Sequence, residues 1–224
     1  MLDKSIFVSY STPNYEGLTN IFMESLLRLG IEKERIQHKL DTPDINLMKN
    51  TGFQSDWWYL CVTNKLYHLI DILNNRAKYT CDYFIFSDCD IWFPEKNKHE
   101  WNNLQSYIDN SGHDIYFMRQ YKFNKINSGL FIIKNNENIP HIANFFRKVV
   151  KEIAQTPKAD MPFGDQSIVQ KYIRRLNYSY IPIEYVIFGT NVYNKQKSLF
   201  HHAISCSDVD DKVKQIEQIK AIIQ

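Results

Sequence analysis

Apolar residues fall into two alternating patterns along this chain. Short, nearly continuous apolar runs are typical of buried strands. Longer segments repeat apolar residues every three or four positions, as helices packed by one face do. The predicted strands cover residues 6–10, 83–86, 115–118, 130–133, 178–183 and 200–204. The predicted helices cover residues 15–29, 56–73, 139–153, 165–176 and 209–223.

This order of elements predicts an α/β fold. Strands that alternate with helices favour a mostly parallel sheet covered on both faces. Ligands of such sheets bind beyond the carboxyl ends of the strands, so residues that directly follow a strand are the first candidates for chemistry. The chain has 224 residues, 44% of them hydrophobic, and shows no repeat, low-complexity tract or linker. We therefore expect one domain over residues 1–224.

Two carboxylates follow the apolar run 83–86. After one serine the chain continues with Asp88, Cys89 and Asp90. Side chains alternate along an extended chain, so both aspartates should share one side and Cys89 the other. Two hard oxygen donors at a strand end are typical ligands of Mg²⁺ or Mn²⁺. The alternative is a solvated loop or helix cap, because aspartates are common in both.

Glycine-rich phosphate-binding motifs are absent from the sequence. Neither Gly-x-Gly-x-x-Gly nor Gly-x-x-x-x-Gly-Lys-Ser/Thr occurs. If a nucleotide binds, a metal ion is then the natural group to hold its phosphates. This absence favours the metal interpretation of Asp88 and Asp90.

Charge and composition narrow the expected partners. The formal net charge is +2, so we expect neither nucleic acid nor an anionic membrane as a partner. No apolar run approaches the ~20 residues needed to span a bilayer, and the first run is too short for a secretory signal. The four cysteines form no Cys-x-x-Cys pair. Reduced thiols and a cytoplasmic location are therefore expected.

Two later segments place small or polar residues beside predicted elements. Asn127 and Gly129 precede the strand 130–133, where they form either an ordinary turn or a crevice in which glycine admits a ligand to the backbone. Asp165 and Gln166 begin a predicted helix. Asp165 could cap that helix, or the pair could read sugar hydroxyls and stabilise positive charge on a sugar ring.

A histidine pair near the chain end offers a further ligand. His201 and His202 lie in the last predicted strand, where either could be core or surface. A neutral imidazole is a good third ligand for Mn²⁺ beside two carboxylates. Because side chains alternate along a strand, only one of the two should face the metal.

These segments, in this order, resemble the GT-A glycosyltransferases that use a metal-bound nucleotide sugar. The pattern is most similar to galactosyl/xylosyl-type families with a late metal-binding histidine, and it runs from Ile6 to about Cys206. The resemblance implies a GT-A fold, a Rossmann-like mixed and mostly parallel sheet flanked by helices. It implies a hexosyl- or pentosyltransferase that needs Mn²⁺ or Mg²⁺. The expected donor is a UDP-sugar, and the acceptor is a glycan or another hydroxyl compound.

The resemblance also assigns residues around the nucleotide. In those families an Asn-Tyr pair after the first strand borders the nucleotide site, and Asn14-Tyr15 matches it. Tyr10, Thr12, Asn14 and Tyr15 become expected contacts to base and ribose. A basic residue on the helix before the Asp-x-Asp strand commonly approaches the donor, and Lys65 stands at that place. A solvated helix face is the alternative for Lys65.

The family's Asn-x-Gly and Asp-Gln motifs match the two segments described above. Asn127, Gly129 and Gln166 are then expected to hold the sugar, and Asp165 is the catalytic candidate. Retention and inversion are both compatible with this arrangement.

The metal ligands implied by the resemblance are Asp88, Asp90 and His202. The family's His-x-x-Gly motif matches only in part, because Ser205 replaces the glycine and no Lys-Pro follows.

Two other classes of protein fit parts of the sequence. A metal-dependent phosphoryl- or nucleotidyl-transfer enzyme also needs clustered carboxylates. A non-catalytic carbohydrate-binding module could use tryptophans as stacking platforms; the chain has Trp57, Trp58, Trp92 and Trp101.

Overall fold

The computed structural model describes residues 1–42, 54–120, 125–204, 206 and 208–223. A central sheet of six strands has the order β2-β1-β3-β6-β5-β7. Strand β6 runs antiparallel to both of its neighbours, and the other pairings are parallel. The strands are β1 (Ser5–Ser11), β2 (Ile36–Leu40), β3 (Tyr83–Ser87), β5 (Ile115–Arg119), β6 (Ile126–Lys134) and β7 (Tyr178–Tyr180). The predicted α/β fold with a mixed, mostly parallel sheet is confirmed.

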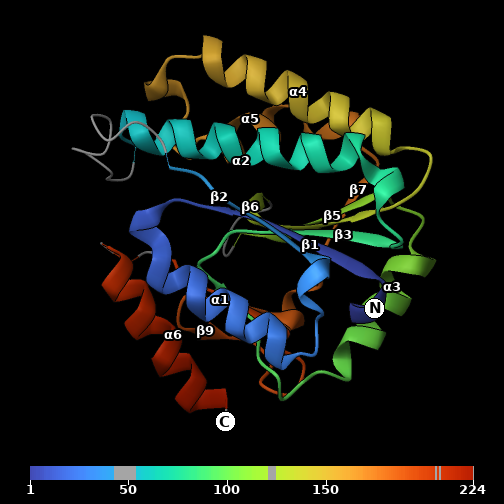
Figure 1. Cartoon of the computed structure of the whole chain (residues 1–224), viewed down its shortest axis with the longest axis vertical. Coiled ribbons are helices and arrows are strands. Elements are labelled where there is room, and N and C mark those ends of the chain that lie inside the picture. Colours follow the sequence, from blue (N-terminus) through green and yellow to red (C-terminus); the bar gives the residue numbers. More distant parts are fainter. Residues whose placement is uncertain (43–53, 121–124, 205, 207, 224) are drawn as a thin grey trace.

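Helices cover both faces of this sheet (Figure 1). The helices are α1 (Glu16–Arg28), α2 (Asp56–Asn74), α3 (Glu100–Asn110), α4 (Ile139–Gln155), α5 (Asp165–Tyr172) and α6 (Val209–Ile223). Helices α2, α4 and α5 share one hydrophobic core with one face of the sheet. Helices α1 and α3 share a second core with the other face. Apolar residues line both faces of the central strands, which explains why these strands read as continuous apolar runs.

A second, smaller sheet lies beside α6, with strand order β4-β10-β8-β9. Its strands are β4 (Ile91–Trp92), β8 (Val186–Phe188), β9 (Asn191–Val192) and β10 (Phe200–His202). A third cluster of buried apolar residues joins this sheet to α6 and α1. The small sheet brings the end of the chain against the segment that follows β3.

The predicted helices and strands are confirmed, with shifts at their ends. Strand β6 begins at Ile126 rather than at residue 130, so Asn127 and Gly129 lie inside a strand and the turn interpretation is wrong. The register between β5 and β6 shifts there, between Phe117 and Met118. The apolar pattern did not predict β2, β4, α3, β8 or β9. All four cysteines are free thiols.

Candidate active site

Three polar side chains meet at the carboxyl end of β3. Asp88 follows β3, Asp90 directly precedes β4, and His202 ends β10. One oxygen of each carboxylate and one imidazole nitrogen lie within 4.8 Å of one another. The pairing of β10 with β4 sets His202 opposite Ile91, and the Ala203 N–H donates to the Asp90 carbonyl at 3.0 Å. The small sheet therefore carries the histidine to the two aspartates.

The Asp88–Asp90 segment is a turn rather than an extended chain. The Ile91 N–H donates to the Asp88 carbonyl at 3.3 Å. The expected extended alternation is wrong here, because the chain has to turn in order to leave the large sheet for the small one. The two carboxylates nevertheless converge on one side.

The atoms in this cluster suit a divalent cation. The Oδ1 atom of Asp90 is buried and has no hydrogen-bond donor among the described residues. The Nε2 atom of His202 lies 3.3 Å from it. Carboxylate oxygens are preferred by Mg²⁺ and Mn²⁺, and imidazole is a common additional ligand of transition metals such as Mn²⁺. The donor set therefore fits an Asp-x-Asp-type metal site.

His201 points away from the cluster, as alternation along β10 requires. It is fully buried, and its Nε2–H donates to the Gly189 carbonyl at 2.9 Å. Burial lowers the pKa of His201 to about 4, so the imidazole is neutral at physiological pH. Of the two histidines, His202 is the one that joins the aspartates. Ser205, which replaces the family's glycine, lies outside the described residues.

Gly129 makes room for the metal-site histidine. A Cβ atom at this position would lie 2.6 Å from Cε1 of His202 and 2.9 Å from Oδ1 of Asn127. The Gly129 carbonyl also accepts a 2.7 Å hydrogen bond from the Asp88 N–H. The imidazole thus fills the space beside Gly129, and a contact from this glycine to the sugar stays a prediction.

We expect Gly129→Ala to weaken metal binding by roughly tenfold, because the added methyl group pushes His202 away from Asp90. The overpacked strand should also lose about 1–3 kcal/mol of unfolding free energy. Calorimetric titration with Mn²⁺ measures the metal affinity, and urea unfolding measures the unfolding free energy. Gly17→Ala is the matched control, because nothing lies within 4 Å of its Cβ position. Unchanged Mn²⁺ affinity in Gly129→Ala would contradict the steric role.

Lys65 ties the catalytic candidate to the carboxylate pair. Its side chain comes from α2 and is buried, with Nζ 3.2 Å from Oδ1 of Asp88 and 3.1 Å from Oδ2 of Asp165. Burial alone would lower the pKa of Lys65, but Asp165 and Asp88 more than offset this and raise it. The alternative of a solvated helix face is wrong for Lys65. Asp165, the first residue of α5, is buried as well.

Lys212 is a site residue that neither the apolar pattern nor the family resemblance predicted. It lies on α6 and forms an ion pair with Oδ2 of Asp90. Burial alone would raise the pKa of Asp90, yet Lys212 and His202 outweigh burial and lower it well below its usual range. Asp90 therefore stays ionised at neutral pH.

The predicted nucleotide contacts gather at a cavity of about 130 Å³. Tyr10, Thr12, Tyr15 and Lys65 are among its lining residues, together with both aspartates of the metal cluster. Asn14 is not in the lining, but its Oδ1 accepts a 2.6 Å hydrogen bond from the Thr12 hydroxyl.

The two amide side chains expected to hold the sugar hydrogen-bond to backbone N–H groups near the start of β6. Oδ1 of Asn127 accepts from the Gly129 N–H at 2.8 Å. Gln166 accepts from the Ser128 N–H at 3.4 Å and donates to Gln120 at 3.1 Å. Their contacts to a sugar stay predictions.

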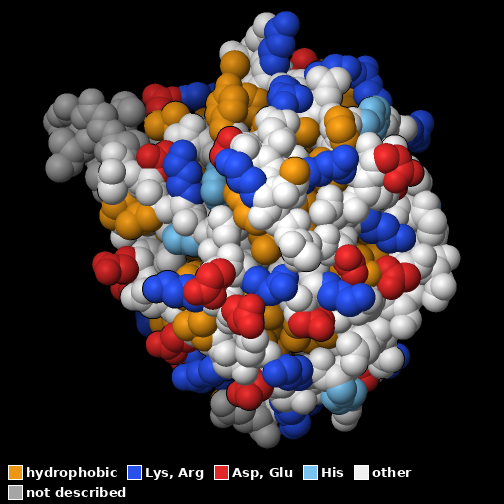
Figure 2. Space-filling model, turned by 45° about the vertical axis from the view of Figure 1, so that its right-hand side comes forward, with side chains coloured by type: hydrophobic (Ala, Val, Ile, Leu, Met, Phe, Trp, Pro, Cys, Tyr) orange, Lys and Arg blue, Asp and Glu red, His pale blue; other side chains and the backbone are white. Residues whose placement is uncertain are grey.

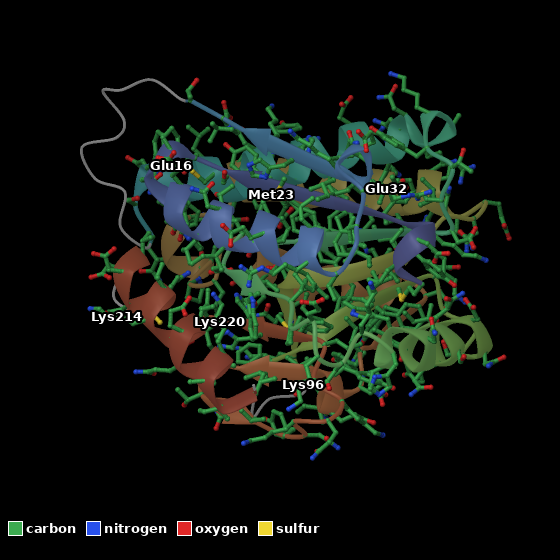
Figure 3. The ribbon with its side chains drawn as sticks, turned by 60° about the horizontal axis from the view of Figure 1, so that its bottom comes forward. Glu16, Met23, Glu32, Lys96, Lys214 and Lys220 are labelled. Carbon is green, nitrogen blue, oxygen red and sulfur yellow. The ribbon has the colours of Figure 1, made fainter. Side chains whose placement is uncertain are left out.

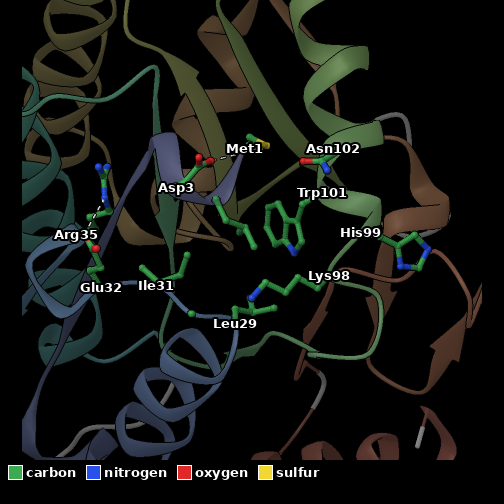
Figure 4. Close-up of a pocket in the computed structure, with 12 residues that line it drawn as sticks. Met1, Asp3, Leu29, Ile31, Glu32, Arg35, Lys98, His99, Trp101 and Asn102 are labelled. Carbon is green, nitrogen blue, oxygen red and sulfur yellow. Dashed lines mark ion pairs between the residues drawn. The ribbon is translucent and has the colours of Figure 1, made fainter.

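Tryptophans do not form an exposed stacking platform. Trp57, Trp92 and Trp101 are buried, and Trp58 is half-buried. Trp101 lines a separate cavity of about 620 Å³, into which Lys98 projects (Figure 4). That cavity includes none of the predicted site residues.

Charge on the surface is mixed. On the face shown in Figure 2, basic and acidic side chains are interspersed rather than gathered by sign. Among the described residues, no helix combines the length and apolar character that crossing a bilayer requires.

Known structures share this fold at low sequence identity. A glycosyltransferase involved in glycosylation of the major capsid of PBCV-1 matches with a TM-score of 0.65 and 15% identity, over 97% of this chain and 98% of that one. The apo form of GlyE from Streptococcus pneumoniae TIGR4 matches with a TM-score of 0.57 and 13% identity, over 99% of this chain and 64% of that one. The galactosyltransferase LgtC, solved with donor and acceptor sugar analogs, gives 0.53 and 10%, over 95% of each chain.

A search of curated protein sequences finds no match. A sequence profile gives the family directly, because the profile for nucleotide-diphospho-sugar transferases matches residues 25–216. This match spans most of the chain and includes the Asp-x-Asp segment, Asp165 and His202. The chain belongs to the nucleotide-diphospho-sugar transferase family and has the GT-A glycosyltransferase fold.

Proposed function

We propose that this protein transfers a sugar from a UDP-sugar to a hydroxyl group of a glycan or another acceptor, as one domain over residues 1–224. The observation that carries the proposal is the meeting of Asp88, Asp90 and His202 at the edge of a cavity lined by the predicted nucleotide contacts. These three residues would hold Mn²⁺ or Mg²⁺, which when bound neutralises charge on the departing diphosphate.

The remaining residues bind and orient the donor. Tyr10, Thr12 and Tyr15 line the cavity and would contact base and ribose. Lys65 pairs with both Asp88 and Asp165 and so holds the Asp165 carboxylate close to the metal cluster. In the proposed complex Asp165 would lie beside the sugar as it leaves the diphosphate. A fixed carboxylate there stabilises positive charge as it develops on the sugar ring, and such preorganised charge speeds the chemical step.

UDP together with Mn²⁺ should stabilise the protein strongly, whereas UDP with a chelator should hardly do so. A ligand that binds only the folded state at a hundred times its Kd stabilises it by about 2.7 kcal/mol. For a chain of this size we expect a rise in Tm of roughly 5–10 °C. Differential scanning calorimetry measures it.

Mn²⁺ alone, and ADP or GDP with Mn²⁺, are the controls for that experiment. Equal stabilisation by UDP in the presence of EDTA would contradict a metal-held diphosphate. A panel of UDP-sugars then identifies the donor by UDP release. Release of phosphate or pyrophosphate instead would favour phosphoryl or nucleotidyl transfer.

A further inference from the structure

The Asp90 carboxylate is already paired with a cationic side chain of the protein itself. The Lys212 ammonium forms an ion pair with Oδ2 of Asp90, while Nε2 of His202 faces Oδ1 at 3.3 Å. The same ammonium lies 5.9 Å from the centre of the Tyr15 ring, within the range of a cation–π contact. Lys212 also lines the cavity assigned to the nucleotide.

The position of Lys212 is fixed by the docking of α6, which lies beside α1 (Figure 3). Ile216 and Ile219 on this helix are fully buried. Gln215 exchanges two 3.1 Å hydrogen bonds with the backbone of Ile204, just after β10. These contacts fix the backbone of α6 at Lys212, so that its side chain faces Asp90. Its side chain is still 20% exposed, and four methylene groups let the ammonium move.

A divalent ion bound by Asp88, Asp90 and His202 would compete with the Lys212 ammonium. Both cations use the same carboxylate, and their charges repel each other at this distance. A diphosphate in the neighbouring cavity changes this balance, because its negative charges attract the ammonium away from Asp90. A bound diphosphate would thereby free an oxygen of Asp90 for the metal.

We propose that Lys212 is a tethered cation that competes with the metal for Asp90 and moves to the donor diphosphate when the nucleotide binds. Metal and nucleotide then bind with positive coupling, and each raises the affinity for the other by the same factor. The inference rests on the proposed function, since it requires the metal cluster and the nucleotide cavity to act together.

The test measures Mn²⁺ affinity directly, by electron paramagnetic resonance of free Mn²⁺, with and without UDP. Without UDP, Lys212→Met should bind Mn²⁺ at least about fivefold more tightly than the wild type. Adding UDP should tighten Mn²⁺ binding in the wild type, and by a clearly smaller factor in Lys212→Met. Lys212→Arg keeps the charge and should behave like the wild type.

Lys214→Met is the matched control. It removes one charge from the same helix, but Lys214 is 71% exposed, pairs with Asp211 and projects outward (Figure 3). Its Mn²⁺ affinity should equal that of the wild type.

The outcomes separate this inference from the proposed function. If Asp90→Asn abolishes Mn²⁺ binding while Lys212→Met leaves it unchanged or weaker, the metal site stands and the competing role of Lys212 is overturned. If neither the wild type nor Lys212→Met binds Mn²⁺, both proposals are overturned.

Discussion

Replacing both metal-site carboxylates, as Asp88→Asn with Asp90→Asn, should lower metal-dependent sugar transfer by at least roughly a thousandfold. A bound metal contributes several kcal/mol of transition-state charge stabilisation, and each 1.36 kcal/mol is tenfold in rate. Asparagine keeps the shape of aspartate but loses the charge that holds a divalent cation. Turnover of the preferred UDP-sugar with Mn²⁺ is the measurement.

The fold of the double variant should survive. Lys65 keeps its ion pair with Asp165, and Lys212 is exposed enough to reach water. Circular dichroism and Tm check this. Asp82→Asn is the matched control, because Asp82 precedes β3 and its carboxylate forms an exposed ion pair with Lys4. A double variant that turns over the donor as fast as the wild type would show that these carboxylates do not carry the reaction.

Lys65→Met should cost about 3–5 kcal/mol of unfolding free energy. Lys65 is the cation between Asp88 and Asp165, and its side chain is 9% exposed. Removing one partner of a buried ion pair leaves an uncompensated charge, which is far more costly than replacing the whole pair. Urea unfolding at pH 7 in the presence of EDTA measures the loss without a contribution from metal.

A second substitution tests whether charge, rather than packing, causes that loss. Asp165→Asn removes one of the two carboxylates that Lys65→Met leaves unpaired. The variant that combines Lys65→Met with Asp165→Asn should therefore recover part of the lost unfolding free energy. The coupling should fall within the 0.5–3 kcal/mol usual for residues in contact. Lys4→Met is the matched control and should cost at most about 1 kcal/mol, because its pair with Asp82 is exposed. A similarly small effect of Lys65→Met would refute the buried bridge.

Elements with a long apolar pattern could be predicted from the sequence, and short ones could not. Strands β4 and β9 have two residues each, too few to show any period. Strand β2 is an edge strand whose last residues are exposed, so it lacks a continuous apolar run. Helix α3 is mostly polar and buries only a narrow stripe that includes Trp101, Leu104 and Ile108.

Both lysines of the site stand at positions of the apolar repeat of their helix. A search for apolar residues alone misses this signal. Lys65 stands three residues after Val62 and four before Leu69, and Lys212 stands four before Ile216. Both lysines therefore continue the buried stripe of their helix, where a charged side chain needs a partner. Their partners could not be read in the same way, because helical periodicity reports burial and not the group that a side chain meets.

The order of the polar residues relative to the strands was fixed by the chain itself: acids directly after β3, a glycine in β6, an aspartate at the start of α5 and a histidine in β10. The family resemblance pointed to His202, and the packed structure shows that His202 rather than His201 joins the acids. Tertiary structure alone decided that Lys65 bridges Asp88 to Asp165 and that Lys212 pairs with Asp90. Those contacts join residues that lie 23 and 122 positions apart in two of the pairs. Local sequence patterns report only on residues within a few positions of one another. Contacts between residues so far apart exist only once the sheets and helices have packed.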